Sequence, residues 1–130
     1  MPHITLEYSA NLEDQMDIAA LCAALRDAAV ASGIFPPAGI RVRAFAATHA
    51  VIADGDARHG FIDISVRIGA GRDAPTQARA ADEIFAAAQA VTADHMAAEP
   101  FMLSLELREA ATETARKDSS IRRFLPPETH

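Results

Sequence analysis

The sequence predicts an α+β fold in which two strand-helix-strand units form a four-stranded sheet with two helices packed on one face. Four segments alternate apolar and polar side chains, as half-buried strands do, and two longer segments carry apolar residues at helical spacing. The order strand-helix-strand occurs twice. Each strand has one apolar face and one mixed, charged face, so both helices are expected to cover the same side of the sheet.

The first βαβ unit spans residues 2–47 and opens with a strand over 3–8 whose alternate side chains are apolar. Asn11 is expected to cap the helix that follows, with acidic residues in its first turn, where the helix dipole favours negative charge. Gly33 is expected to end this helix in the left-handed conformation. A second alternating segment over 40–46 predicts the next strand.

The second βαβ unit spans residues 60–109 and begins with the clearest alternation in the chain, over 61–68. Pro75 suits the first turn of the helix after it, and this helix must end before Pro100. A last alternating segment over 101–108 predicts the fourth strand. With parallel strands, each unit is expected to be a right-handed crossover.

Length and composition predict a single domain over residues 1–130, of which 110–130 form a polar tail. The net charge of −6 argues against a nucleic-acid partner, because phosphate binding needs a basic surface. The absence of an apolar run of about 18 residues predicts no membrane span. The lone Cys22 and an amino terminus unlike a secretion signal predict a cytoplasmic location. Cys22 itself lies on an apolar helical face, as an inert thiol would.

Arginine dominates the basic residues: eleven of the twelve are Arg. Four lie in the middle of an otherwise acidic chain, namely Arg41, Arg43, Arg67 and Arg72. Guanidinium groups suit two-pronged contacts with carboxylates, so these residues indicate a small anionic partner. The simpler interpretation, that each is a solvated surface arginine, is equally open at any one position.

Pro2 is the first candidate for chemistry. Removal of Met1 by a methionine aminopeptidase, which accepts a small following residue such as proline, would leave a secondary amine at the chain end. A free α-amino group titrates at about 8, and burial or nearby Arg charge lowers that value towards neutrality, where a proton-transferring base works best. The alternative is an incidental proline in second position, because proline is a common residue.

Other motifs predict less. The run Gly69-Ala70-Gly71-Arg72-Asp73-Ala74 fits a dinucleotide fingerprint, but the strand before it alternates and so is not covered on both faces. The five histidines show no metal-ligand spacing, so no metal site is predicted. Glu7 and Glu106 face the uncovered side of the sheet, where they would activate water in a hydrolytic enzyme or balance nearby arginines.

Three segments together resemble the 5-carboxymethyl-2-hydroxymuconate Δ-isomerase family of the tautomerase superfamily, whose members use an amino-terminal proline. They are residues 1–3, the eleven-residue block 33–43 and the turn 68–72, in matching order and spacing over residues 2–109. The block 33–43 is the most specific of the three, and Ala53-Asp54-Gly55 and Leu103-Ser104 also look like the family. The tail after Glu109 resembles the family poorly.

The resemblance implies a tautomerase-like mixed sheet, with the first strand of each unit central and antiparallel, rather than a hairpin through Asp54-Gly55. It also implies a homotrimer with the open sheet faces turned to the three-fold axis, and no metal or organic cofactor. Arg41 and Arg72 would be catalytic residues that bind the carboxylates and dienolate of the substrate, with Arg43 a further substrate-binding residue. The reaction would belong to the breakdown of homoprotocatechuate, formed from 4-hydroxyphenylacetate.

The hypothesis is therefore an isomerase that transposes a C=C bond by moving a proton on an anionic dienol, with Pro2 as general acid and base. Two alternatives remain open. One is another activity of the superfamily, such as a phenylpyruvate-type tautomerase, a decarboxylase or a dehalogenase. The other is a catalytically silent trimeric binding module, in which a retained Met1 would make the proline nitrogen a non-basic amide.

Overall fold

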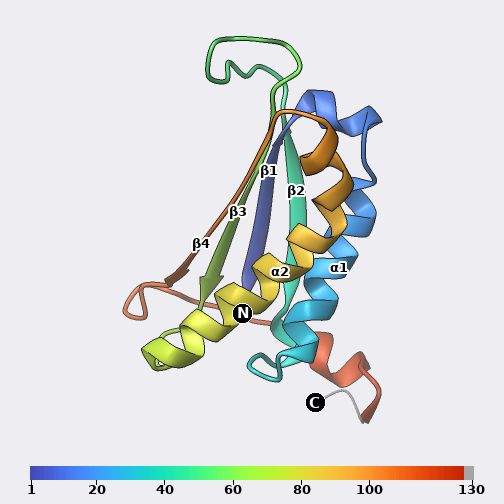
Figure 1. Ribbon diagram of the computed structural model, residues 1–130. Coiled ribbons are helices and arrows are strands. Elements are labelled where there is room, and N and C mark those ends of the chain that lie inside the picture. Colours follow the sequence, from blue (N-terminus) through green and yellow to red (C-terminus); the bar gives the residue numbers. More distant parts are fainter. Residues whose placement is uncertain (128–130) are drawn as a thin grey trace.

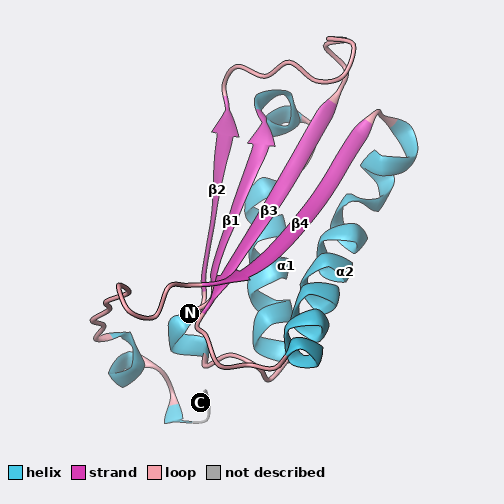
Figure 2. Cartoon of the chain, turned by 90° about the vertical axis from the view of Figure 1, so that its left-hand side faces the viewer, coloured by secondary structure: helices cyan, strands magenta, loops and turns pink. Residues whose placement is uncertain are grey.

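The computed structural model describes residues 1–127 and contains four strands and two long helices (Figure 1). In chain order they are β1 (His3–Ser9), α1 (Ile18–Ala31), β2 (Arg41–Ala47), β3 (Gly60–Ile68), α2 (Ala74–Ala98) and β4 (Phe101–Glu109). Three short 3-10 helices accompany them: η1 (Ala10–Asp14), η2 (Pro37–Gly39) and η3 (Ile121–Phe124). Both α-helices lie on the same face of the sheet (Figure 2), which confirms the two-layer α+β fold.

The sheet is mixed, with strand order β2-β1-β3-β4. β1 pairs parallel with β2, and β3 pairs parallel with β4, so each βαβ unit is a parallel pair joined by a helix. The two units meet where β1 and β3 pair antiparallel in the centre. Because β2 and β3 are not neighbours, residues 48–59 cannot be a tight hairpin, and the family order expected from the resemblance is confirmed.

The core lies between the sheet and the two helices. Leu6 of β1 and Ile64 of β3 are fully buried and face Leu25 of α1 and Ile84 of α2 across this space. Burying a side chain of this size contributes roughly 1.5–3 kcal/mol, so the alternation of the strands is itself the main source of the fold's stability. The rigid core holds the ends of the strands, and the loops attached to them, in fixed positions.

The start of α1 differs from the prediction. The capping residue is Asp17, whose Oδ1 accepts a hydrogen bond from the Ala20 N–H at 2.9 Å, and Asn11 lies instead within η1. The Asn11 amide donates to the carbonyl oxygens of His59 at 2.9 Å and Ala57 at 3.3 Å. An Asn side chain that ties down a distant loop is not available to cap a helix, and the helix therefore begins seven residues further along, at Ile18.

The other predicted ends are correct. Gly33 follows α1 with a φ of 71°, the left-handed conformation that glycine adopts without strain. Pro75 lies in the first turn of α2, which Asp73 caps through the Thr76 N–H at 2.9 Å, and α2 ends at Ala98, before Pro100.

No helix or strand of residues 1–127 covers the opposite face of the sheet (Figure 2). The strand register places four cationic or titratable side chains in one row across it, in the order Arg41, His3, Arg67, Arg108. Two apolar side chains on strands β2 and β4 are largely exposed, Phe45 at 56% and Met102 at 63%. A single chain therefore leaves one face of the sheet open to its surroundings. This face carries arginine side chains and large apolar side chains.

Candidate active site

Pro2 lies at the point where the chain enters β1. Its side chain is less than 2% exposed, and its carbonyl oxygen accepts a hydrogen bond from the backbone N–H of Arg41 at 3.1 Å. Met1 continues from it alongside Gly39, where a side chain would collide with the Met1 nitrogen. The amino terminus is thus held between the edge of β2 and the loop before it, and Gly39 permits the close approach.

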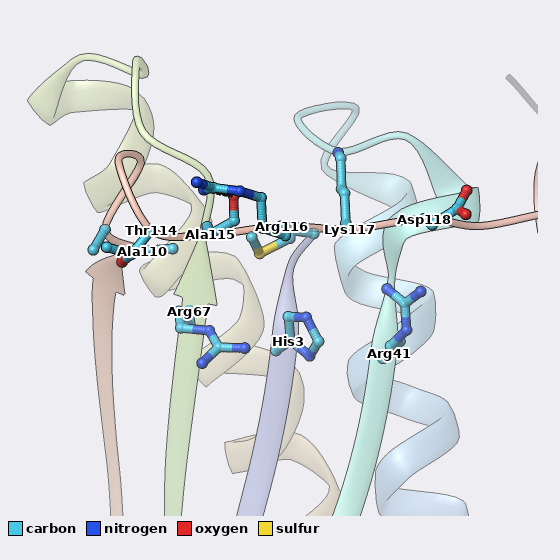
Figure 3. Close-up of a pocket in the computed structure, with 11 residues that line it drawn as sticks. His3, Arg41, Arg67, Ala110, Thr114, Ala115, Arg116, Lys117 and Asp118 are labelled. Atoms are coloured by element: carbon cyan, nitrogen blue, oxygen red, sulfur yellow. Dashed lines mark hydrogen bonds between the residues drawn. The ribbon is translucent and has the colours of Figure 1, made fainter.

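Two hollows meet at this terminus. The larger, of about 550 Å³, is lined by Met1, His3, Arg41 and Arg67 together with residues of the tail between 110 and 118 (Figure 3). The smaller, of about 330 Å³, lies between the tail and the loop before β2, and it is lined by Met1, Pro36, Ala38, Gly39, Arg41, Lys117, Asp118, Ser119 and Arg122. Met1 and Arg41 line both hollows, so the residue that precedes Pro2 separates two spaces rimmed by positive charge.

Arg41 is positioned by β2. It is half-buried, and its Nη1 donates to the Gly39 carbonyl oxygen at 3.2 Å. In Figure 3 its guanidinium group points from the strand towards the tail segment that carries Lys117 and Asp118. The structure therefore brings Arg41 beside the amino terminus.

Arg72 belongs to the second βαβ unit and contacts residues of the first. Its Nη2 donates to the Ile34 carbonyl oxygen at 3.1 Å and its Nη1 to that of Gly69 at 3.4 Å, while the guanidinium carbon lies 5.0 Å from the centre of the Phe35 ring. A cation over an aromatic face is attracted by the ring's electron-rich centre. The two segments that carried the resemblance, 33–43 and 68–72, are thus in direct contact, although Arg72 lines neither hollow.

The electrostatics of the terminus follow from this arrangement. Partial burial lowers the pKa of the Met1 amino group below its ordinary value of 8.0, and the positive charges of Lys117, Arg41 and Arg72 lower it further. Each neighbouring cation disfavours a second positive charge, so the neutral, proton-accepting form of an amine is stabilised here. The direction is the one a base at this position needs.

Arg43 is placed elsewhere. It lies on the open face of the sheet, exposed, with its Nη1 3.1 Å from Nδ1 of His3. Burial lowers the pKa of His3, as do the nearby charges of Arg67 and Arg43. Arg43 therefore faces a separate hollow of about 270 Å³ on the sheet and does not line either space beside Met1.

Glu7 and Glu106 do not balance the arginines of this face. The register places Glu7 beside Phe45 and Asp63, and Glu106 beside Ser65. Within residues 1–127 neither carboxylate forms an ion pair with an arginine.

Comparison with known proteins decides the family. The model of the 5-carboxymethyl-2-hydroxymuconate isomerase family matches residues 2–125. The chain belongs to this family. A 5-carboxymethyl-2-hydroxymuconate Delta-isomerase of Escherichia coli is 32% identical over 109 residues, which cover 84% of this chain and 86% of that protein.

Solved structures agree with this family. A 5-carboxymethyl-2-hydroxymuconate delta-isomerase superposes with a TM-score of 0.89 at 30% identity, over 95% of this chain and 92% of that one. A 5-carboxymethyl-2-hydroxymuconate isomerase from Deinococcus radiodurans R1 gives 0.87 at 32% identity, over 96% and 95%. The tautomerase-like fold extends further: a fused 4-OT described as a symmetric trimer gives 0.65 at 16% identity, covering 87% and 91%.

The tail lines the candidate site, and sequence patterns did not predict this. The family match reaches residue 125 and so includes most of the tail, which by sequence alone resembles the family poorly. After β4 the chain turns and runs across the ends of all four strands, above His3, Arg41 and Arg67 (Figure 3). A signal was present: residues 110–127 contain four cations and two acids in a chain of net charge −6.

Residues 1–127 bring together no group of three or more His, Cys, Asp or Glu side chains able to hold a metal ion. None of the helices in this part of the chain is both long and apolar enough to cross a membrane.

Proposed function

We propose that this chain is a cofactor-independent isomerase that moves a proton on a dienol such as 5-carboxymethyl-2-hydroxymuconate, with the imino nitrogen of Pro2 as base. The observation that carries the proposal is the cationic surrounding of the buried amino terminus, in a chain that belongs to the isomerase family. We place the reaction in the cytoplasmic breakdown of homoprotocatechuate, an aromatic acid. The small anionic substrate is the partner to which the arginines would bind.

Removal of Met1 is part of the proposal. Met1 lies between Pro2 and Gly39 and lines both hollows, so its loss would join the two spaces and leave the Pro2 nitrogen facing them. The same cleavage converts that nitrogen from a non-basic amide into a secondary amine. The buried Pro2 ring and its hydrogen-bonded carbonyl would keep the amine in one place without a flexible side chain.

The proton transfer needs no co-reactant. The Pro2 nitrogen takes the proton of the 2-hydroxyl group, the C2–O bond becomes a carbonyl as the double bonds shift, and the protonated amine returns a proton to a carbon further along the conjugated system. Negative charge grows on the 2-oxygen in between. Arg41 and Arg72 would stabilise this charge and bind carboxylates, since donors already in place cost no reorganisation during the reaction.

We rank Arg43 below Arg41 as a substrate-binding residue, because Arg43 contacts His3 and lines neither hollow beside Met1. We propose that the open face of the sheet turns towards the three-fold axis of a homotrimer. The exposed Phe45 and Met102 support this, as does the symmetric trimer described for the fused 4-OT of the same fold. In such a trimer Arg43 and His3 would lie on the sheet face that is turned towards the other subunits.

The test combines intact mass with direct assay. Purified chain is weighed to establish whether Met1 is removed, and turnover of 5-carboxymethyl-2-hydroxymuconate is followed by ultraviolet absorbance. We expect the mass of the chain from Pro2 and a fast loss of the dienol signal. Full retention of Met1, or no turnover by chain that begins at Pro2, would exclude the proposal.

The same assay separates the other activities of the superfamily. Phenylpyruvate tests a simple tautomerase, malonate semialdehyde a decarboxylase, and chloroacrylic acids a dehalogenase. Chloroacrylic acids are tested because hydrolytic dehalogenation needs an acid that activates water. Asp118 is the one carboxylate of residues 1–127 that lines both hollows. Equal or higher turnover of any of these substrates would replace the muconate as the substrate class.

A further inference from the structure

We propose that Lys117, from the tail, binds a carboxylate of the substrate and makes the Pro2 site selective for acids that carry more than one carboxylate. The inference rests on the proposed function and extends it to substrate choice. It assigns a role to a segment that sequence patterns left unexplained. Its basis is the path of the tail, which carries a lysine to the amino terminus from 115 residues away in the chain.

Lys117 lines both hollows beside Met1. It lines the hollow of about 550 Å³ together with Met1 and Arg41, and it lines the hollow of about 330 Å³ with the same two residues. Figure 3 shows its side chain rising from the tail, on the side of the segment opposite Arg41. An anion with widely spaced carboxylates, bound where Met1 now lies, would meet Arg41 on one side and Lys117 on the other.

The three cations near the amino terminus differ in how far other groups of the protein already bind them. Arg41 and Arg72 both donate to backbone carbonyl oxygens, and Arg72 also covers the Phe35 ring. Lys117 forms no ion pair within residues 1–127. Its charge is nevertheless close enough to lower the pKa of the terminal amine more than either arginine does. An ammonium group that is near the reacting position and not engaged by the protein is available to a ligand.

Asp118 is the strongest objection, because its carboxylate lines the same hollows and would repel an anion. In Figure 3, however, the Lys117 ammonium and the Asp118 carboxylate lie apart, although both side chains rise on the same side of the tail. Within residues 1–127 the two groups form no ion pair. The lysine is therefore not neutralised by its neighbour.

The chain offers a matched control. Arg123 belongs to the same tail and carries the same charge, but its guanidinium carbon lies 5.2 Å from the Phe124 ring centre and it lines neither hollow beside Met1. Lys117→Met and Arg123→Met therefore remove the same charge from the same segment, one at the site and one away from it. Lys117→Arg tests whether a cation at position 117 is sufficient.

The experiment measures kcat and KM for 5-carboxymethyl-2-hydroxymuconate and for a monocarboxylate, phenylpyruvate in its enol form. A hydrogen bond to a charged group is worth about 10- to 100-fold in binding, so Lys117→Met is expected to raise KM for the muconate by that factor. The monocarboxylate should change less than about two-fold, and Lys117→Arg should restore most of the lost affinity. Arg123→Met should behave as the unchanged chain.

A second readout does not depend on turnover. Calorimetric titration of the chain that begins at Pro2 with propane-1,2,3-tricarboxylate should show weaker binding for Lys117→Met than for Arg123→Met. Equal constants for these two variants, in both kinetics and titration, would overturn the role of Lys117 while leaving the isomerase proposal intact. Absence of muconate turnover in the unchanged chain would instead remove the proposed function, and the titration would still decide whether Lys117 binds a polycarboxylate.

Discussion

The two ends of the sheet carry charged side chains in opposite ways. At the site end, where β1 and β2 begin and β3 and β4 finish, Arg41, Arg72 and Lys117 surround the amino terminus without a carboxylate partner within residues 1–127. At the loop end, below residues 48–59, charges are paired. His59 Nε2 lies 2.6 Å from Asp54 Oδ1, and Arg58 Nη2 lies 3.2 Å from Glu99 Oε2.

Both ends are hollowed, so a cavity alone does not distinguish them. A space of about 280 Å³ lies at the loop end, lined in part by Asn11 and His59. The Asn11 amide donates to the His59 carbonyl oxygen, and His59 Nε2 lies against Asp54 Oδ1. Hydrogen bonds from the backbone of Asp56 and from the His59 side chain hold the pKa of Asp54 below its usual range, so this carboxylate stays ionised beside His59. Within residues 1–127 the two ends differ in their cations, which at the site end lie without carboxylate partners around the half-buried Met1 amine, and this is the end at which we propose that the reaction takes place.

The largest effect is expected from removing a cation at the site end. Arg41→Ala takes away a preorganised donor for the developing oxyanion, and losses of this kind are typically about 100- to 1,000-fold in rate. Kinetics with the muconate measure it. Arg58→Ala at the loop end removes an exposed, paired arginine and should change the rate less than about two-fold. Similar losses for both variants would break the comparison.

Pro2→Ala is expected to weaken turnover rather than abolish it. Alanine is also small enough for Met1 to be removed, and the resulting primary amine still accepts a proton, though at a different position and basicity. Full removal of a general base costs about 100- to 10,000-fold, so the loss here should stay below about 100-fold. Rates are compared only after intact mass shows that both chains begin at residue 2. A variant with unchanged kcat and unchanged pH profile would argue that the amine is not the base.

The pH profile sharpens the role of the surrounding charge. The amine works when neutral, so kcat/KM should rise with pH through the pKa of the Pro2 amine in the chain that has lost Met1. The burial and the three cations that lower the pKa of the Met1 amine are expected to lower this pKa as well. Removing one cation, as in Arg41→Ala or Lys117→Met, favours the protonated form and should move this rise to higher pH by up to about one unit. Arg58→Ala provides the control profile, which should coincide with that of the unchanged chain.

The smallest effect is expected at the loop end, and on stability alone. Asn11→Ala removes two hydrogen bonds that join η1 to the end of the loop over residues 48–59. We expect a decrease of about 0.5–1.5 kcal/mol in the free energy of unfolding, measured by urea denaturation, with kcat/KM unchanged. A substantial loss of activity at unchanged stability would show that the loop end takes part in catalysis.

Position along the chain explains which parts of the site were predictable. Pro2 is adjacent to a strand with clear alternation, so its place at a strand end follows from the sequence, and Arg41 begins the next alternating segment. The contact of Arg72 with Phe35 joins residues 37 apart, and no local pattern encodes it. The prediction that Asn11 caps a helix was wrong for the same reason, because its hydrogen-bond partners are 46 and 48 residues away in the chain.

By itself the sequence determined which faces of the strands and helices are buried. Apolar residues that recur every two residues, or every 3.6, lie on one face of a strand or a helix and are buried together. It also determined the helix ends that depend on backbone chemistry, such as Gly33 and Pro75. Only the tertiary structure decided that the tail crosses the strand ends and brings Lys117 to the amino terminus. The path of an irregular, polar segment depends on contacts with distant surfaces, and its own residues carry no periodicity that records them.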